Sequence, residues 1–202
     1  MKRKQRKFRL SRRIGQPLWG QAKDPSNDRN YGPGQHGVRR GVLSGYGEQL
    51  RAMQKFKIYY GLKEKALSRL YKMAVRLKGD SSEHLIGLLE TRLASFVYRS
   101  KLAPTIFSAN QFVVHKHVKV NGRICNCPSR LLKVGDKVEL VTKAHQIPAV
   151  IQAIADNSRD VPEYIRVDHG HFAAELVSVP HLDDVPYPVV MQPNLVVEYY
   201  SQ

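Results

Sequence analysis

The 202-residue sequence contains two cysteines, one tryptophan and no long hydrophobic run. Cys125 and Cys127 are separated by one residue, a spacing that suits neither a disulfide framework nor a four-ligand zinc site, so we interpret both as free thiols. A membrane-spanning helix needs roughly 18 uninterrupted apolar residues, and no segment approaches that length. We therefore expect neither a membrane protein nor a signal peptide.

Acidic residues are scarce in the first half of the chain. Residues 1–101 hold 24 basic and 7 acidic side chains, whereas residues 102–202 hold 9 and 10. The formal net charge of the whole chain is +16, which would repel itself unless a polyanion neutralised it. Hydrophobic residues make up 42% of the chain, enough for one or two modest cores. The composition predicts a folded protein with an anionic partner.

The sequence also lacks the common catalytic motifs. It contains no P-loop, G-x-S-x-G, H-E-x-x-H or C-x-x-C pattern, and its carboxylates are too scattered to suggest an acid and base pair. His115 and His117, like His169 and His171, would share one face of a strand, as metal ligands sometimes do. No cysteine or carboxylate set completes either pair. We therefore predict no enzyme, no metal site and no cofactor.

Residues 1–45 predict a basic, extended N-terminal arm. The segment combines a run of Lys and Arg with many Gly and Pro residues, and it shows no sustained helical or strand period. Such an arm has little apolar surface to offset its ordering entropy, so we expect its partner to fix it. The alternative is a mitochondrial targeting segment, for which only Phe8, Leu10 and Ile14 could form an apolar face.

Three amphipathic helices are predicted over residues 46–91. The first begins near Tyr46, the second follows Gly61 and ends near Gly79, and the third begins at Asp80 or Ser81 as its N-cap. The predicted inward-facing residues are Leu50, Met53, Phe56, Tyr60, Leu67, Leu70, Tyr71, Ala74, Leu77, Leu85, Leu88, Leu89 and Leu93. These helices predict a small helical domain.

The pattern changes from helix to strand within residues 92–176. A helix is predicted from Thr105 to about His115, and Asn121-Gly122 is a strong hairpin signal between short alternating strands. A further helix is predicted over 146–158, and short strands over 164–167 and 174–179. The fold class is therefore α+β.

Residues 92–136 resemble the S-four RNA-binding module, in which two helices precede a turn into a small sheet. The residues that carry the resemblance are Arg92-Leu93, Val97-Tyr98-Arg99, Ala109, Gln111-Phe112-Val113, His115, Val118-Lys119-Val120-Asn121-Gly122, Pro128-Ser129 and Gly135-Asp136. Pseudouridine synthases, some tyrosyl-tRNA synthetases and a small heat-shock RNA-binding protein carry similar modules. The module alone therefore leaves the function open.

Motifs outside the module narrow the resemblance to one family. They are Leu10-Ser11-Arg12-Arg13, Pro33-Gly34-Gln35-His36-Gly37, Tyr46-Gly47, Gln49-Leu50-Arg51 and Val197-Glu198-Tyr199-Tyr200-Ser201. Over essentially its whole length the chain resembles the universal small-subunit ribosomal protein four family. Trp19-Gly20 and Asp184-Val185-Pro186-Tyr187-Pro188 look most like the alphaproteobacterial type.

The resemblance implies a structural constituent of the small ribosomal subunit. Such a protein would bind the five-prime domain of 16S-type ribosomal RNA, nucleate assembly of the subunit body and contribute to translational accuracy. The implied partners are this RNA, small-subunit proteins five and twelve, protein three as a further candidate, and mRNA where it enters the subunit. No membrane or small-molecule substrate is implied. The expected location is a bacterial cytoplasmic ribosome, with a mitochondrial matrix ribosome as the alternative.

The family likeness also implies how the domains are arranged. The arm would cover residues 1–45, and a helical domain would cover residues 46–91, completed by residues 177–202. The remaining residues, 92–176, would form an inserted domain with the S-four module at about 92–155. The C-terminal residues would thus belong with the first helices, which periodicity alone does not indicate.

The expected RNA contacts fall in the arm, a glycine-rich turn, the first helix and the module. Arginine can engage two phosphate oxygens with its planar fork, lysine supplies a flexible point charge, and glycine lets backbone amides approach RNA. The predicted RNA-binding residues are Lys2, Arg3, Lys4, Arg6, Lys7, Arg12, Arg13, Gln35, His36, Gly37, Arg39, Arg40, Gln49, Arg51, Lys55, Lys57, Gln111, His115, Lys116, His117, Lys119, Asn121, Gly122 and Arg123. Tyr31, Tyr46 and Tyr59 are open candidates for base stacking, whereas core packing is favoured for Tyr60.

Two positions depart from the family pattern. Asn110 stands where relatives usually have Arg, and Ala94 where they usually have Asp, so one expected phosphate contact and one polar contact are missing. Some relatives bind zinc through N-terminal cysteines, but residues 1–124 contain none here. Three other functions stay open: an RNA-modifying enzyme, for which little chain remains, a free factor acting on stalled ribosomes, and a DNA-architectural protein.

Overall fold

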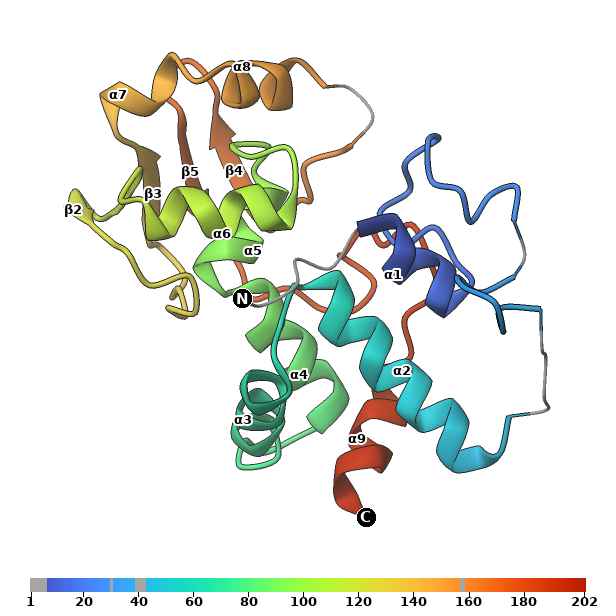
Figure 1. The fold of residues 1–202 in the computed structure, drawn as a ribbon. Helices are drawn as coiled ribbons and strands as arrows, with labels where there is room; N and C mark the ends of the chain where they lie inside the picture. Colours follow the sequence, from blue (N-terminus) through green and yellow to red (C-terminus); the bar gives the residue numbers. More distant parts are fainter. Residues whose placement is uncertain (1–6, 30, 39–42, 157–158) are drawn as a thin grey trace. The chain divides into compact units, whose positions relative to one another are not determined.

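The computed structural model describes residues 7–29, 31–38, 43–156 and 159–202, and the chain divides into two compact units (Figure 1). The first unit is formed by Met1–Tyr71 and Tyr187–Gln202, and the second by Lys72–Pro186. The second unit is therefore an insertion in the chain of the first. Helices together with an antiparallel sheet confirm the α+β class. The predicted domain boundaries stay a prediction.

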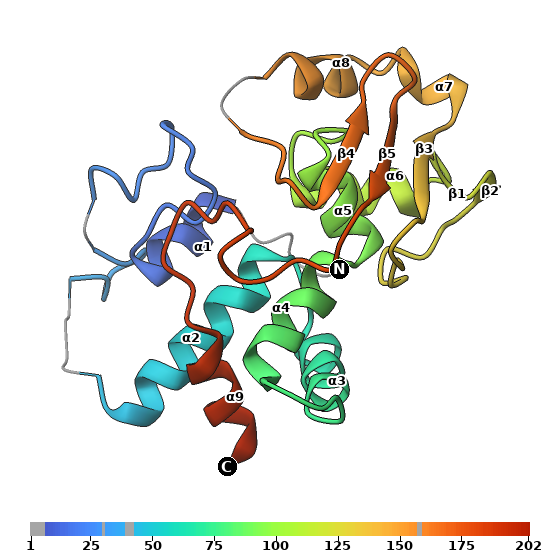
Figure 2. The same ribbon diagram turned by 180° about the vertical axis from the view of Figure 1, so that it is seen from behind.

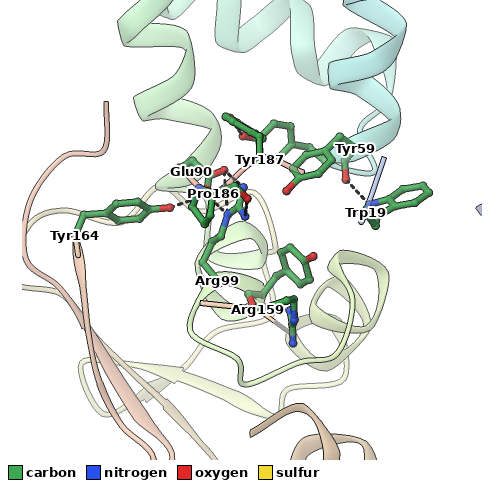
Figure 3. Close-up of polar contacts among 10 residues, drawn as sticks. Trp19, Tyr59, Glu90, Arg99, Arg159, Tyr164, Pro186 and Tyr187 are labelled. Atoms are coloured by element: carbon green, nitrogen blue, oxygen red, sulfur yellow. Dashed lines mark hydrogen bonds and ion pairs between the residues drawn. The ribbon is translucent and has the colours of Figure 1, made fainter. Parts of the chain in front are cut away.

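The N-terminal segment contains a helix, α1 (Lys7–Ile14), where only an extended arm was predicted. Ile14 is 1% exposed and Leu18 is fully buried. Trp19 is also buried, and its Nε1 donates a hydrogen bond to the Tyr59 carbonyl at 3.4 Å (Figure 3). The extended-arm prediction was wrong over α1 because Leu10 and Ile14, four residues apart, lie on the same side of the helix, where Ile14 is buried within the first unit.

Two helices that are far apart in the sequence pack together in the first unit. They are α2 (Gly45–Tyr59) and α9 (Pro193–Ser201), and their contact buries Phe56 and Val196 completely. The Ser44 hydroxyl caps α2 by accepting a hydrogen bond from the Gly47 amide at 3.3 Å. α9 begins at a proline, which is favoured there because the first helical turn needs no amide donor. The predicted start of α2 is confirmed.

Helix α3 (Glu64–Ala74) ends earlier than the sequence predicted. The Arg76 amide bonds to the Met73 carbonyl and the Leu77 amide to the Ala74 carbonyl, each three residues back, so the chain continues in turns. Gly79 then adopts a φ of +120°. The predicted helix was too long because its apolar period extends past the last α-helical hydrogen bond.

Helices α4 (Ser81–Glu90) and α5 (Leu93–Arg99) precede the sheet of the second unit in the sequence. Helix α4 begins where predicted, since the Asp80 carboxylate accepts a hydrogen bond from the Ser82 amide at 2.8 Å. Helix α5 follows after a two-residue break, and all of its residues are buried. Burial on every side of α5 marks it as the centre of this unit.

The second unit contains a five-stranded antiparallel sheet in the order β2-β1-β3-β5-β4 (Figures 1 and 2). Its strands are β1 (Val118–Val120), β2 (Arg123–Ile124), β3 (Lys137–Leu140), β4 (Ile165–Asp168) and β5 (Ala173–Leu176). Helices α5 and α6 (Ile106–Val114) lie on one face of the sheet, as the two opposite views agree. The predicted helix near 105–115, the hairpin at Asn121-Gly122 and the two later strands are confirmed.

The sheet has one apolar and one charged face. Val118, Val120 and Val138 are buried, at most 1% exposed, whereas the alternating residues Lys119 and Glu139 lie on the opposite face. Lys119 is directly opposite Glu139 in the register of β1 and β3. The alternation predicted from the sequence thus separates a packed face from a polar one.

Two short helices follow β3. Helix α7 spans Thr142–His145, and helix α8 spans Pro148–Ala155. The helix predicted over 146–158 is confirmed only over the shorter range of α8. Its proline does not interrupt it, because Pro148 occupies the first helical position, where its missing amide is not needed.

A buried ion pair joins α4 and α5 in the second unit (Figure 3). Arg99 donates to both carboxylate oxygens of Glu90, with its NH2 group 2.9 Å from Oε1, and also to the Pro186 carbonyl at 3.2 Å. The Tyr164 hydroxyl donates to the second Glu90 oxygen at 3.1 Å. Because the charges are fully hydrogen-bonded, a pair this deeply buried can be accommodated. It also fixes the Tyr164 segment against α4.

Candidate nucleic-acid interface

Part of the predicted arm lies outside the described residues. Lys7 is in α1, but its side chain is not described. The predicted residues that lie outside entirely are Lys2, Arg3, Lys4, Arg6, Arg39 and Arg40. RNA contact by this group stays a prediction.

Arg12 and Arg13, both on α1, have different surroundings. An Arg12 NH2 donates to the Gly32 carbonyl at 3.1 Å, and the guanidinium lies 5.0 Å from the centroid of the Tyr31 ring. Arg13 is exposed. Arg12 therefore holds the following loop against the helix, whereas Arg13 is available to phosphates.

The glycine-rich turn is closed by its own backbone. The Gly32 amide bonds to the Gly37 carbonyl at 3.1 Å, and the Gly37 amide to the Gly34 carbonyl at 3.2 Å. A Cβ on Gly37 would lie 1.9 Å from the Gly32 carbonyl oxygen, so only glycine fits. Gln35 and His36 are exposed at the tip. The turn thus presents these two side chains, while part of its backbone is already hydrogen-bonded.

The predicted residues of α2 are mostly bound within the protein. Lys57 Nζ lies 2.8 Å from Glu64 Oε2, and Arg51 donates to the Ile14 carbonyl. Gln49 donates to Glu198 at 3.1 Å. Their charges and donors are therefore already partly engaged.

Lys55 corrects the prediction that it belongs to an exposed helix face. Its side chain is buried, and Nζ donates to the Val190 carbonyl at 3.0 Å. Burial, and secondarily the nearby Arg51 charge, lower the pKa of Lys55. The exposure prediction was wrong because α9 and the segment before it cover this face of α2, and their position follows from distant sequence.

The candidate stacking tyrosines also separate. Tyr59 is 3% exposed and Tyr60 is 1% exposed, so core packing is confirmed for Tyr60 and applies to Tyr59 as well. Tyr46 is 55% exposed, with its ring centroid 5.8 Å from that of Tyr199. Tyr31 is 43% exposed beneath Arg12. Only Tyr31 and Tyr46 of the four remain open to a base.

The end of α6 brings four predicted residues together. Gln111, His115 and Lys116 are exposed, and Lys116 has a φ of +65° where the chain leaves the helix. The His117 ring centroid lies 6.1 Å from those of His115 and Phe112. The helix end therefore forms one polar surface supported by an aromatic contact.

The hairpin separates Lys119 from Arg123. Arg123 pairs with Val120, so its side chain starts on the face that carries the helices, whereas Lys119 pairs with Ile124 on the opposite face. Arg123 is exposed because β2 is a two-residue edge strand. The predicted module residues thus do not form one uninterrupted groove: Arg123 is on the α6 side, and Lys119 is on the charged face.

Asn121, which was predicted to contact RNA, uses its side chain within the protein. Its Nδ2 donates to Asp136 Oδ1 at 2.8 Å, and its Oδ1 accepts from the Lys137 amide at 2.8 Å. Asp136 Oδ2 accepts from the Lys133 amide at 2.9 Å. Burial alone would raise the pKa of Asp136, but the hydrogen bonds from Lys133 and Asn121 and the charges of Arg130 and Lys133 lower it.

Two basic residues near the hairpin were missed by sequence reasoning. Arg130 and Lys133 are exposed, and both act electrostatically on Asp136. They lie in the segment between Pro128 and Gly135, whose spacing was noted only as a turn. The signal that could have found them was the presence of two cations between two turns, in a segment without a helical or strand period.

The two departures from the family pattern have simple local surroundings. Asn110 Nδ2 donates to the Ile106 carbonyl at 3.0 Å, one turn earlier in α6. Ala94 is completely buried in α5, and its amide donates to the Pro128 carbonyl at 3.2 Å. Asn110 therefore bonds to its own helix instead of supplying a cation, and Ala94 fills space near the loop that carries Arg130.

Within residues 7–29, 31–38, 43–156 and 159–202, no three or more His, Cys, Asp and Glu side chains are grouped as a metal site, and no helix is both long and apolar enough to cross a bilayer. Cys125 is buried and Cys127 is exposed, both as free thiols. A hydrogen bond with Ser129 is the main cause that lowers the pKa of Cys127.

Two family descriptions match adjacent parts of the chain. The ribosomal protein S4/S9 N-terminal domain matches residues 2–90, and the S4 domain matches residues 91–138. The second match contains α5, α6, the hairpin and the start of β3. The resemblance to the S-four module is thereby confirmed.

Relatives match along the whole chain. A small ribosomal subunit protein uS4 of Ruegeria pomeroyi is 53% identical, with 100% of this chain and 98% of that protein covered. A protein of the same name from Chelativorans sp. is 54% identical, covering 100% and 99%, and one from Ruegeria sp. is 55% identical, covering 100% and 98%. These relatives confirm the alphaproteobacterial likeness.

Proposed function

Because the chain belongs to the uS4 family of small ribosomal subunit proteins, we propose that it is a structural constituent of that subunit and binds its ribosomal RNA. The family is one of ribosomal structural proteins and not of enzymes. The observation that carries the proposal is the exposed surface of the matched module. There Lys116 and Arg123 have no carboxylate partner among the described residues.

The binding would be electrostatic and guided by shape. Lys116, Arg123, Arg130 and Lys133 are exposed cations on a small rigid scaffold, and each phosphate they neutralise would release counterions. Gln111 can add hydrogen bonds to sugar hydroxyls, which proteins use to recognise folded RNA. The protein would hold RNA helices in place without covalent chemistry.

The finer roles are part of the same proposal. We expect binding to the five-prime domain of 16S-type RNA, nucleation of the subunit body, and an effect on translational accuracy together with small-subunit proteins five and twelve. Protein three and mRNA where it enters the subunit are further expected neighbours. A bacterial cytoplasmic ribosome is the proposed location, with a mitochondrial matrix ribosome as the alternative. Full-length similarity to bacterial uS4 proteins supports the bacterial location.

A salt titration of RNA binding tests the proposal. The full-length chain is mixed with a five-prime-domain fragment of small-subunit RNA, and with an unrelated structured RNA of equal length. The proposal requires markedly tighter binding to the first RNA at moderate salt. A variant carrying Lys116→Gln and Arg123→Gln should reduce the slope of log K against log salt by about 1.8, at roughly 0.9 per lost phosphate contact.

A matched control uses cations elsewhere. Lys63→Gln and Lys65→Gln remove the same charge from exposed positions outside the module. If this control changes the slope as much as the module variant, net charge and not the module binds the RNA. Equal affinity for both RNAs would remove the specific assignment.

Two other functions are separated by different readouts. A permanent constituent stays with small subunits at one copy each through a high-salt wash, whereas a free factor is stripped off. Modified bases appearing in unmodified ribosomal RNA after incubation with the pure protein would favour the enzyme. Binding duplex DNA as tightly as structured RNA would favour the DNA-architectural role.

A further inference from the structure

The β1–β2 hairpin turn is fastened to the turn before β3. Asn121 and Gly122 have φ values of +50° and +76°, the pair of positive values that a type I′ turn requires. The Asn121 amide bonds to the Lys137 carbonyl at 2.8 Å, and its side-chain oxygen accepts the Lys137 amide. One residue of the hairpin therefore holds both backbone groups of Lys137.

The carboxylate of Asp136 completes the connection. It accepts one hydrogen bond from Asn121 Nδ2 and another from the Lys133 amide, at 2.8 and 2.9 Å. We call the Asn121–Asp136 pair, with the Lys133 and Lys137 amides, the turn clamp. The Asn121 side-chain amide thus connects the Lys137 backbone amide to the Asp136 carboxylate. The carboxylate in turn connects Asn121 to the Lys133 backbone amide.

The turn clamp lies at the surface and not in the core. Asn121 is exposed and Asp136 is half-buried, whereas the strands themselves are held by the buried Val118, Val120 and Val138. Core packing therefore accounts for the sheet without the clamp. What the clamp adds is a fixed direction for the hairpin tip, where the two-residue strand β2 makes few contacts of its own.

The clamp's charge is opposite to that of its neighbours. Arg130 and Lys133 both act electrostatically on Asp136, and both side chains are exposed. An RNA-binding surface built for positive charge alone would not include a carboxylate, because it repels phosphate. The presence of a carboxylate here indicates that ordering the hairpin tip stabilises RNA binding by more than the carboxylate's repulsion of phosphate weakens it.

We propose that Asn121 and Asp136 are positioning residues for RNA binding, which fix the hairpin tip so that Arg123 and Lys133 meet phosphates without further ordering. The inference rests on the proposed function. It replaces the prediction that Asn121 itself contacts RNA, since its amide is bonded to protein groups. A tip ordered in advance loses less conformational entropy on binding, and so binds more tightly.

An exchange of the two side chains gives a sharp test. When Asn121→Asp is combined with Asp136→Asn, the carboxylate placed at position 121 would accept from the Lys137 amide and from the side-chain amide placed at position 136. The oxygen of that side-chain amide would in turn accept from the Lys133 amide. Every clamp hydrogen bond and the net charge are preserved. Asn121→Asp alone instead places two carboxylates next to each other. Asp136→Asn alone places two side-chain amides next to each other.

The single variants should bind five-prime-domain RNA less tightly than the wild-type protein, and the exchange should restore binding. Asn121→Asp should weaken binding about tenfold, the equivalent of losing one charge-assisted hydrogen bond. Asp136→Asn removes a negative charge, so electrostatics alone predicts tighter binding; the clamp predicts binding about threefold weaker. The double exchange should lie within about twofold of wild type.

Controls separate positioning from charge and folding. Asn126→Asp adds the same charge at an exposed position five residues from Asn121, and should weaken binding less than Asn121→Asp. The salt slope should fall in the single variants and return in the exchange, which loss of stability alone would not produce. Thermal unfolding of each variant identifies any that fail to fold. If a single variant does not fold, the comparison of the exchange variant with the wild-type protein provides the test.

Three results would overturn the positioning role. They are tighter binding by Asp136→Asn, equal loss in Asn121→Asp and Asn126→Asp, or an exchange variant that folds but binds no better than the single variants. These outcomes differ from failure of the proposed function, in which the wild-type protein itself would not prefer the five-prime-domain RNA.

Discussion

Basic residues of α2 and of the S-four module were both predicted to bind RNA, yet their surroundings differ. On α2, Lys55 is buried and donates a hydrogen bond to the Val190 carbonyl, and Lys57 forms an ion pair with Glu64. In the module, Lys116 and Arg123 are exposed and have no carboxylate partner in the described part of the chain. The first pair holds the protein together, and the second is open to an external anion.

The difference shows that charge in a sequence does not identify its use. A cation contributes to stability when its own fold supplies carbonyls or carboxylates, and to binding when it does not. Lys55 and Arg123 carry the same charge, but substitution should affect different measurements. The following substitutions test that separation.

The largest loss of stability is expected at the buried ion pair between Glu90 and Arg99. Glu90→Gln leaves Arg99, which is 7% exposed, without its counterion, so unfolding free energy should fall by about 3–5 kcal/mol. Urea unfolding measures it, with exposed Glu163→Gln as the matched control. A loss no greater than in the control would show that the Arg99 bonds to other groups are sufficient.

Lys55→Met should act on stability and not on RNA binding. The lost hydrogen bond to the Val190 carbonyl should lower the free energy of unfolding by about 1–2 kcal/mol. The salt slope of RNA binding should stay unchanged, as it should for the exposed Lys63→Met. A reduced slope with unchanged stability would return Lys55 to the RNA-binding set.

Arg123→Gln should have the opposite profile. Its stability should remain within about 0.5 kcal/mol of wild type, because the side chain is exposed. RNA affinity should fall about fivefold, with the salt slope reduced by about 0.9. Lys119→Gln, on the other sheet face and opposite Glu139, is the comparison and should lose less. Equal losses would mean that RNA contacts both faces.

The smallest effect concerns Glu64, which is paired but exposed. Burial alone would raise its pKa, but hydrogen bonds from Lys57 and Tyr200 and the Lys57 charge lower it below the ordinary value of 4.5. Such a carboxylate stabilises the fold above pH 4.5 and loses that contribution as pH falls through its lowered pKa. Its side chain is 47% exposed, so the contribution should be under about 1 kcal/mol.

Comparing Glu64→Gln with wild type at two pH values checks the direction. The variant should be slightly less stable at neutral pH, and the difference should shrink as the pH falls through the lowered pKa of the wild-type carboxylate. Urea midpoints at the two pH values provide the measurement. A difference that grows in acid would contradict the lowered pKa.

Much of the fold was predictable because its signals are local. The Asp80 cap, the period of α4 and the Asn121-Gly122 turn each depend on a few neighbouring residues, and each prediction was confirmed. The S4-domain residues were recognised by spacing within one segment and are matched over 91–138. Local rules suffice where one element determines its own geometry.

The remaining features depend on distant parts of the chain. Burial of Lys55 requires the segment near Val190, and burial of Trp19 requires the Tyr59 region. The clamp role of Asn121 needs Asp136, fifteen residues away. No periodicity connects such positions, so the predicted site included residues that the fold uses internally and did not consider the exposed Arg130 and Lys133.

The single tryptophan makes the first unit optically distinguishable. Trp19 is 8% exposed, so its fluorescence should shift to longer wavelength when its surroundings open to water. In a Cys127→Ser variant, the buried Cys125 would be the chain's sole thiol, and its reaction with a thiol-selective reagent would report opening of the second unit. Coincident transitions would indicate one cooperative unfolding step, whereas separate transitions would assign a stability to each unit.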